Sequence, residues 1–204
     1  MAEQLNYTEI IKEHFFNPRN FLKNDAEAEF VKTADGFGEV GNPICGDVMK
    51  LWIKIDKQND KIIECKWQTF GCVAAIATTS MLSVMVTENS GMPIQEALSL
   101  TPQEIVKRLG AIPPKKFHCA VLGNRALKAA LNHYFRKTEQ YARIIPLEGN
   151  ILDEKLKFTD KEVSEWIKNG AKSIAQIEEK LGAKIDNPET KAKLVQMFKI
   201  KENG

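Results

Sequence analysis

Three of the four cysteines lie where a thiolate could bind a metal ion. Cys45 lies in the glycine-bounded stretch GNPICGD, and Asp47, two residues later, could offer an oxygen to the same atom. Because glycine has no side chain, the backbone there can approach a bound atom closely. Cys72, in FGCVAA, lies where a predicted strand gives way to a predicted helix, and Cys119, preceded by His118, lies at the start of a later helix. The amide dipoles at a helix start favour thiolate over thiol.

These side chains would supply three sulfurs plus an oxygen or a nitrogen, a set that suits zinc or iron with sulfide. The wide spacings between these three cysteines match no compact zinc finger, and small half-buried cysteines are common at glycine turns. From the residues alone, a shared metal site and simple packing both stay open. Cys65 is the contrast, because it lies between Ile63 and Trp67 on the apolar side of an alternating pattern and is predicted to be a core residue. His14 and His133 are predicted to be structural.

The elements that must position these residues are short strands and several helices. Alternating apolar residues predict an antiparallel pair of strands at 49–56 and 63–67, with a third strand if GFGEVG pairs. A terminal helix should begin after Thr8 and end before Pro18. The run VAAIATTSMLSVMV suits a buried helix, and a capping box starts another helix at Thr101. A long helix follows Cys119, with a polar face predicted to carry Arg125, Lys128, Asn132 and Arg136.

The chain is predicted to divide into a first domain (1–137), a linker (138–155) and a helical extension (156–204). In the extension, Thr159 and Ser173 should cap two short helices and Pro188 should open a third. The interior of this extension is predicted to hold Trp166, Ile167, Ile177, Leu181, Leu194, Val195 and Phe198.

Composition narrows the possible functions. The formal charge of +2, from 29 basic and 27 acidic residues, gives no field suited to nucleic acid or a membrane surface. No apolar run is long enough to span a membrane, and the first residues do not resemble a signal peptide, so a cytoplasmic location is expected. In that reducing compartment, disulfides are not expected. The P-loop motif G-x-x-x-x-G-K-[ST] and the nucleophile-elbow motif G-x-S-x-G are absent from the sequence.

The stretches GNPICGD, FGCVAAIATTS and PPKKFHCA, in this order, closely resemble the three cysteine motifs of the NifU/IscU-type iron-sulfur scaffold family. HFFNPRN also resembles the opening helix and turn of that family. The resemblance covers about residues 5–136. It implies an α+β fold in which a small antiparallel sheet packs against helices, followed here by a short helical extension.

The resemblance implies a scaffold for iron-sulfur cluster assembly, and not an enzyme. A cysteine desulfurase would deliver persulfide sulfur to Cys119, and iron would join it as a [2Fe-2S] cluster on Cys45, Cys72 and Cys119. Asp47 or His118 would be the fourth ligand, and the sequence does not distinguish between them. Such a ligand holds iron less firmly than a fourth thiolate, so the cluster could pass to apo-proteins. Zinc could occupy the thiolates on isolation.

The stretch IPPKK resembles the family's site for an Hsp70-type chaperone, which works with a J-protein co-chaperone. Pro113, Pro114 and Lys116 match that site, and Lys115 stands where an apolar residue is usual. A homodimer is a further expectation. The first alternative function is a zinc-containing sulfur acceptor in a sulfur relay, but His118 and the compact spacing before the last cysteine favour the scaffold branch. The second alternative is a structural zinc protein that handles no sulfur.

The extension resembles the BFD-like ferredoxin domain of longer NifU proteins, but it has no cysteine with which to bind that domain's cluster. It is interpreted either as a remnant kept for docking or packing, or as a helical addition that stabilises the first domain.

Overall fold

One antiparallel sheet with the strand order β1-β2-β3-β4 forms the centre of the structure, a computed structural model that describes residues 7–23, 28–41 and 47–202. The strands are β1 (Gly36–Gly41), β2 (Val48–Asp56), β3 (Lys61–Thr69) and the short β4 (Met92–Pro93). The predicted pair and the conditional third strand are therefore present, and the sequence analysis missed β4. Two residues are too few to show a strand pattern.

The helices within the described residues are α1 (Glu9–Phe16), α2 (Ala28–Thr33), α3 (Val73–Thr87), α4 (Ile94–Ser99), α5 (Pro102–Arg108), α6 (Phe117–Lys137), α7 (Asp160–Lys168), α8 (Ile174–Leu181) and α9 (Pro188–Glu202). Short 3₁₀ turns lie at η2 (Pro114–Lys116) and η3 (Tyr141–Arg143). The predicted α+β fold, with a small antiparallel sheet packed against helices, is confirmed. No helix in the described part of the chain is both long enough and apolar enough to cross a membrane.

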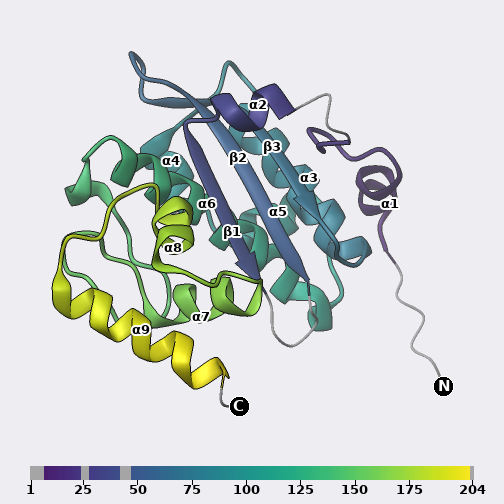
Figure 1. Ribbon diagram of the computed structural model, residues 1–204. Coiled ribbons are helices and arrows are strands. Elements are labelled where there is room, and N and C mark those ends of the chain that lie inside the picture. Colours follow the sequence, from purple (N-terminus) through teal and green to yellow (C-terminus); the bar gives the residue numbers. More distant parts are fainter. Residues whose placement is uncertain (1–6, 24–27, 42–46, 203–204) are drawn as a thin grey trace.

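Helices α3 and α6 cover one face of the sheet, as Figure 1 shows. The strand residues that face them are apolar, and Met49, Leu51 and Ile53 of β2 are completely buried. Helix α6 lies very close to β1 because Gly36 and Gly38 have no side chains. A β-carbon at Gly38 would collide with the backbone of α6.

Strand β3 departs from the predicted alternation at Ile63. Lys54 pairs with Glu64 and Ile55 pairs with Ile62, so Ile63 is the extra residue of a β-bulge. Because a bulge reverses the side on which later residues point, Ile62 is buried and Ile63 is 43% exposed. The prediction for Ile63 was therefore wrong.

Local capping accounts for several helix starts. Thr8 caps α1 by accepting a hydrogen bond from the backbone N–H of Ile11, and Asn17, just before Pro18, is the C-cap. Thr101 and Thr159 each form a complete capping box, and Ser173 caps α8 through the N–H of Gln176. These predicted starts are confirmed, because a cap depends on residues within one turn.

The predicted polar face of α6 is partly buried, which corrects the sequence analysis. Asn132 is fully buried and exchanges hydrogen bonds with the backbone of Ile145. Arg136 is 3% exposed and donates to the carbonyl oxygens of Leu156 and Lys157. These polar side chains are buried because the chain after α6 folds back over them and offers backbone partners.

Helices α7, α8 and α9 enclose a second cluster of buried apolar side chains. Of the predicted interior, Trp166, Ile167, Ile177, Leu181 and Leu194 are buried. Phe198 is partly buried against the cluster, and Val195 is 41% exposed, so its prediction was wrong. The ring of Tyr141 packs against both this cluster and the larger one beneath the sheet.

Candidate metal centre

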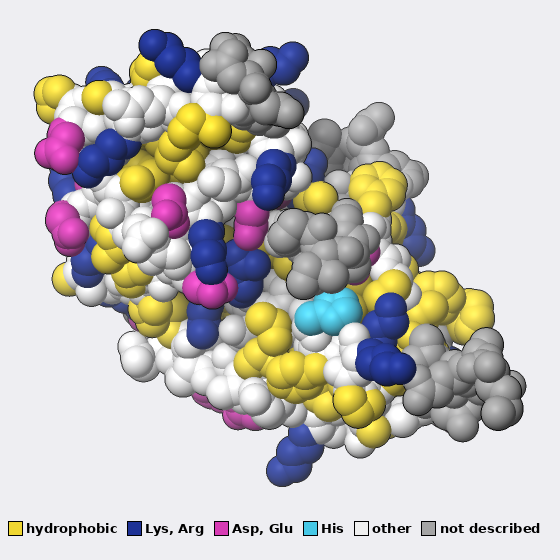
Figure 2. All heavy atoms as spheres, turned by 90° about the horizontal axis from the view of Figure 1, so that it is seen from below, with side chains coloured by type: hydrophobic (Ala, Val, Ile, Leu, Met, Phe, Trp, Pro, Cys, Tyr) yellow, Lys and Arg dark blue, Asp and Glu magenta, His cyan; other side chains and the backbone are white. Residues whose placement is uncertain are grey.

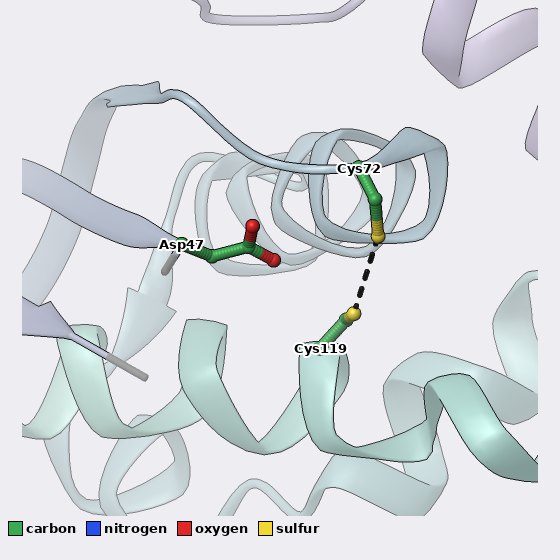
Figure 3. Close-up of side chains that lie close together, drawn as sticks. All are labelled: Asp47, Cys72 and Cys119. Carbon is green, nitrogen blue, oxygen red and sulfur yellow. Dashed lines mark hydrogen bonds between the residues drawn. The ribbon is translucent and has the colours of Figure 1, made fainter. Parts of the chain in front are cut away.

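Asp47, Cys72 and Cys119 meet at the end of the sheet where β2 begins. One ligand atom from each residue lies within 4.8 Å of the other two. Figure 3 shows the two sulfurs facing each other, with the carboxylate of Asp47 directed toward them. Cys72 and Cys119 are 47 positions apart in the sequence. They meet because β3 leads into α3, which begins after Cys72, and α6, which carries Cys119, packs beside α3.

Cys72 is the N-cap residue of α3. Its sulfur accepts a hydrogen bond from the Cys119 thiol, which is the main reason that its pKa is lowered to about 5. Burial opposes this shift, whereas the backbone N–H groups of Ala75 and Ala74 and the charge of Lys116 support it. Cys72 is therefore placed to be the thiolate, as the helix-start argument predicts.

Cys119 lies in the first turn of α6 and is completely buried. Its sulfur lies 3.6 Å from that of Cys72. The hydrogen bond to Cys72 raises the pKa of Cys119, and burial raises it further, while the charge of Lys116 acts weakly in the opposite direction. The two sulfurs thus hold one proton, and in the metal-free pair it belongs to Cys119.

Asp47 is 7% exposed, and its Oδ2 is buried without a hydrogen-bond partner among the residues that the structure describes. A buried carboxylate oxygen is costly unless it is paired or binds a cation. Gly71 leaves room beside the carboxylate of Asp47, because a β-carbon at Gly71 would lie 3.3 Å from the carboxyl carbon of Asp47 and 2.8 Å from the β-carbon of Ala75. The carboxylate and the two sulfurs therefore form a set of donors suited to a cation.

His118 is half-buried, and within residues 7–23, 28–41 and 47–202 its buried Nε2 has no hydrogen-bond partner. The structure does not bring it into the group formed by Asp47, Cys72 and Cys119. Cys45 lies outside the described residues. Cys65 is 1% exposed, and burial raises its pKa to about 12, so its predicted place in the core is confirmed.

The proline and lysine residues of the proposed chaperone site lie directly before α6. Pro114 is exposed, Pro113 and Lys116 are half-exposed, and Pro114 through Lys116 form the turn η2. Figure 2 looks at the molecule from below the view of Figure 1 and shows hydrophobic, Lys or Arg side chains and a histidine together on one face.

Two aromatic residues near the centre were missed by the sequence analysis. Tyr7 is partly buried, and burial, followed by the negative charge of Cys72, raises its pKa. Phe70, next to Gly71 in the sequence, is 95% exposed. No local pattern in the sequence indicates a role for Tyr7. Phe70, by contrast, could have been noticed from the sequence, because it is an aromatic residue between the end of a predicted strand and a glycine.

A sequence profile described as the NifU-like N terminal domain matches residues 6–141. The chain belongs to this family. It is 42% identical over 138 residues to iron-sulfur cluster assembly scaffold protein IscU 1 of Archaeoglobus fulgidus, covering 68% of this chain and 82% of that relative. It is 44% identical over 131 residues to the scaffold protein IscU of Aquifex aeolicus, covering 64% and 77%.

Among solved structures, one similar chain is a putative iron-sulfur cluster assembly scaffold protein for the SUF system from Fervidobacterium islandicum. It is 23% identical, with a TM-score of 0.45, over 61% of this chain and 96% of that one.

Proposed function

We propose that this protein is a scaffold on which an iron-sulfur cluster is assembled and from which it passes to other proteins. The observation that carries the proposal is the meeting of Asp47, Cys72 and Cys119 within 4.8 Å. Thiolates are the usual protein ligands of iron-sulfur clusters. The naming of relatives such as IscU of Aquifex aeolicus as scaffold proteins supports the same role.

The cluster is the cargo of this site, and we propose that it is a [2Fe-2S] cluster held by Cys45, Cys72 and Cys119. Asp47 is our proposed fourth ligand, because its carboxylate oxygen faces the two sulfurs and has no hydrogen-bond partner within the described part of the chain. His118 is the alternative fourth ligand. A carboxylate is a harder ligand than thiolate, so one oxygen among sulfurs would favour release of the cluster.

Sulfur would arrive as a persulfide on a cysteine desulfurase, and we propose Cys119 as its acceptor. The acceptor thiolate attacks the outer sulfur, the donor S–S bond breaks, and the desulfurase cysteine leaves as thiolate. Two electrons from an external reductant are then needed to convert the transferred sulfur to sulfide.

Cys119 is buried and holds the shared proton, so it is a poor nucleophile in the metal-free pair. An iron ion bound beside it would release that proton, because a cation favours both thiolates. Iron is therefore expected to bind before sulfur is accepted.

Three kinds of partner follow from this role: a cysteine desulfurase, apo iron-sulfur recipients, and an Hsp70-type chaperone with its J-protein. The exposure of Pro114 and the partial exposure of Pro113 and Lys116 before α6 support an accessible chaperone site. A homodimer stays a prediction.

The test is anaerobic reconstitution with Fe(II), cysteine and a catalytic amount of a cysteine desulfurase. Visible absorption, iron and sulfide are measured for the wild type and for Cys45→Ser, Cys72→Ser and Cys119→Ser. Cys65→Ser is the matched control, because Cys65 is buried in the core and does not belong to the group of Asp47, Cys72 and Cys119. We expect a chromophore with equal iron and sulfide that is lost in the three variants and kept in the control. Persulfide formation with retained zinc and no cluster would instead support a sulfur relay.

A further inference from the structure

The helical extension contacts the outer edge of β1. This strand is at the edge of the sheet, so no other described strand pairs with its outward backbone groups. The carbonyl oxygen of Glu39 accepts a hydrogen bond from the indole of Trp166 at 3.3 Å. The N–H of Gly41 donates to the carboxylate of Glu165 at 3.1 Å. Side chains of α7 thus serve as partners for an edge strand.

Glu165 also contacts the first domain at a second point. Its other carboxylate oxygen pairs with the guanidinium of Arg125 at 2.8 Å. The side chains of Glu165 and Arg125 are only 16% and 22% exposed, so solvent screens this pair less than a surface pair. One carboxylate of the extension therefore joins the end of β1 to α6.

Both contact points lie close in the fold to the candidate metal centre. Gly41 pairs with Val48 of β2, and Val48 directly follows Asp47. Arg125 lies on the same helix as Cys119, fewer than two turns further along. The carboxylate of Glu165 thus connects the end of β1, which pairs with the residue that follows Asp47, to the helix that holds Cys119.

We infer that Glu165 is a positioning residue that sets the separation of Asp47 and Cys119, so that the extension helps to shape the metal centre. The inference rests on the proposed function in one respect, namely that Asp47 and Cys119 bind the same metal ion. The extension would then have a role at the metal centre in addition to forming its own apolar cluster.

Glu178 offers a matched control in the same extension. Its carboxylate also accepts from one backbone N–H, that of Ile185 at 3.0 Å, and pairs with one cation, Lys184 at 2.7 Å. Both partners lie within the extension. Glu178→Ala therefore removes the same kinds of contact as Glu165→Ala without touching β1 or α6.

The experiment measures Co²⁺ binding by the metal-free full-length chain under anaerobic conditions. Absorption bands of Co²⁺ bound to thiolate report both the affinity and the geometry of the site. We expect Glu165→Ala to bind Co²⁺ about tenfold more weakly than the wild type, with shifted visible bands. Glu165→Gln keeps an oxygen that can accept from the Gly41 N–H, so its Co²⁺ affinity should fall less than that of Glu165→Ala. Glu178→Ala should lower the melting temperature but keep wild-type Co²⁺ affinity and bands.

Wild-type affinity and bands in Glu165→Ala would overturn the inference and leave the proposed function intact. An equal loss of affinity in Glu178→Ala would also overturn it, because general destabilisation would then be the cause. If the wild type bound Co²⁺ without thiolate bands, the proposed metal centre itself would fail, and the inference with it.

Discussion

The proton shared by Cys72 and Cys119 determines the chemistry of the centre at the scale of single residues. The 3.6 Å contact between the sulfurs and the backbone N–H groups at the start of α3 both favour thiolate on Cys72. Cys72 is also half-exposed, whereas Cys119 is buried. Cys72 should therefore meet a reagent or a metal ion first.

In the metal-free protein, alkylation of Cys72 should be nearly independent of pH between about 6 and 8, because its pKa is about 5. The rate for an ordinary thiol, with a pKa near 8.5, rises about tenfold per pH unit over this range. Peptide-resolved mass spectrometry after timed exposure to iodoacetamide measures this. In Cys119→Ala the hydrogen bond is lost, and the Cys72 rate should become pH-dependent. A steep pH profile in the wild type would contradict the prediction.

Asp47→Cys should slow transfer of a reconstituted cluster to an apo-ferredoxin, because a thiolate holds iron more firmly than a carboxylate. The loss of the scaffold's circular-dichroism signal over time measures transfer. Asp47→Asn, which keeps an oxygen of similar size without charge, should transfer at least as fast as the wild type. Equal rates in Asp47→Cys and the wild type would show that Asp47 is not a cluster ligand.

At the scale of elements, the close packing of β1 on α6 brings the sheet and the helix that carries Cys119 together. It depends on Gly38, where a β-carbon would lie 2.7 Å from the backbone nitrogen of Ala130 and closer still to the carbonyl oxygen of Ala126. Backbone atoms cannot move aside as a flexible side chain can, so the two elements would have to separate.

Gly38→Ala should therefore lower the free energy of unfolding by about 3 kcal/mol or more. Gly123→Ala, on the helix α6 against which Gly38 packs, is the matched control, because its β-carbon would make ordinary contacts of 3.4 and 3.5 Å with Thr79 and Leu82. It should be neutral or stabilise by up to about 1 kcal/mol through helix propensity. Urea denaturation measures both, and similar values for the two variants would refute the packing argument.

At the scale of the whole molecule, polar side chains join the two apolar clusters. Glu39 of β1 is buried and pairs with Lys180 of α8 at 2.8 Å. Arg136 of α6 is buried and donates to carbonyl oxygens beyond the helix. His133 of α6 lies against α8, since a β-carbon at Gly182 would come within 2.8 Å of its Nε2. The contact region between the two apolar clusters, called the junction below, therefore contains an ionisable side chain, that of His133, at a packed surface.

Acid should weaken this junction. Burial lowers the pKa of His133 to about 4, with the charges of Lys137 and Arg136 acting in the same direction, while the backbones of Glu179 and Asp35 partly oppose them. The unfolded chain therefore takes up the proton first as pH falls. This contribution to stability is complete above about pH 6.5 and is lost toward pH 4, by about 2 to 3 kcal/mol.

Urea denaturation between pH 4 and 7 measures the effect by comparing the wild type with His133→Gln. The difference in pH dependence between the two belongs to His133, since other groups, including the buried His14, titrate in both proteins. Parallel stability curves would show that His133 does not govern the acid response.

The sequence by itself determined the features that depend on neighbouring residues. Caps at Thr8, Thr101 and Thr159 predicted helix starts correctly, because a cap and its partner lie within one turn. The alternating pattern of β2 and the placement of Cys72 and Cys119 at helix starts were readable for the same reason. The burial of Cys65 followed from its place in the strand.

Only the tertiary structure decided what distant segments do to one another. The bulge at Ile63 depends on pairing between two strands, and the burial of Asn132 and Arg136 depends on a segment that folds back over α6. The link from Glu165 to Gly41 joins residues 124 positions apart, so no local pattern could reveal it. The hydrophobic pattern of a segment shows that a face will be buried, but the partner and the hydrogen bonds that it offers are set by the packing of the whole chain.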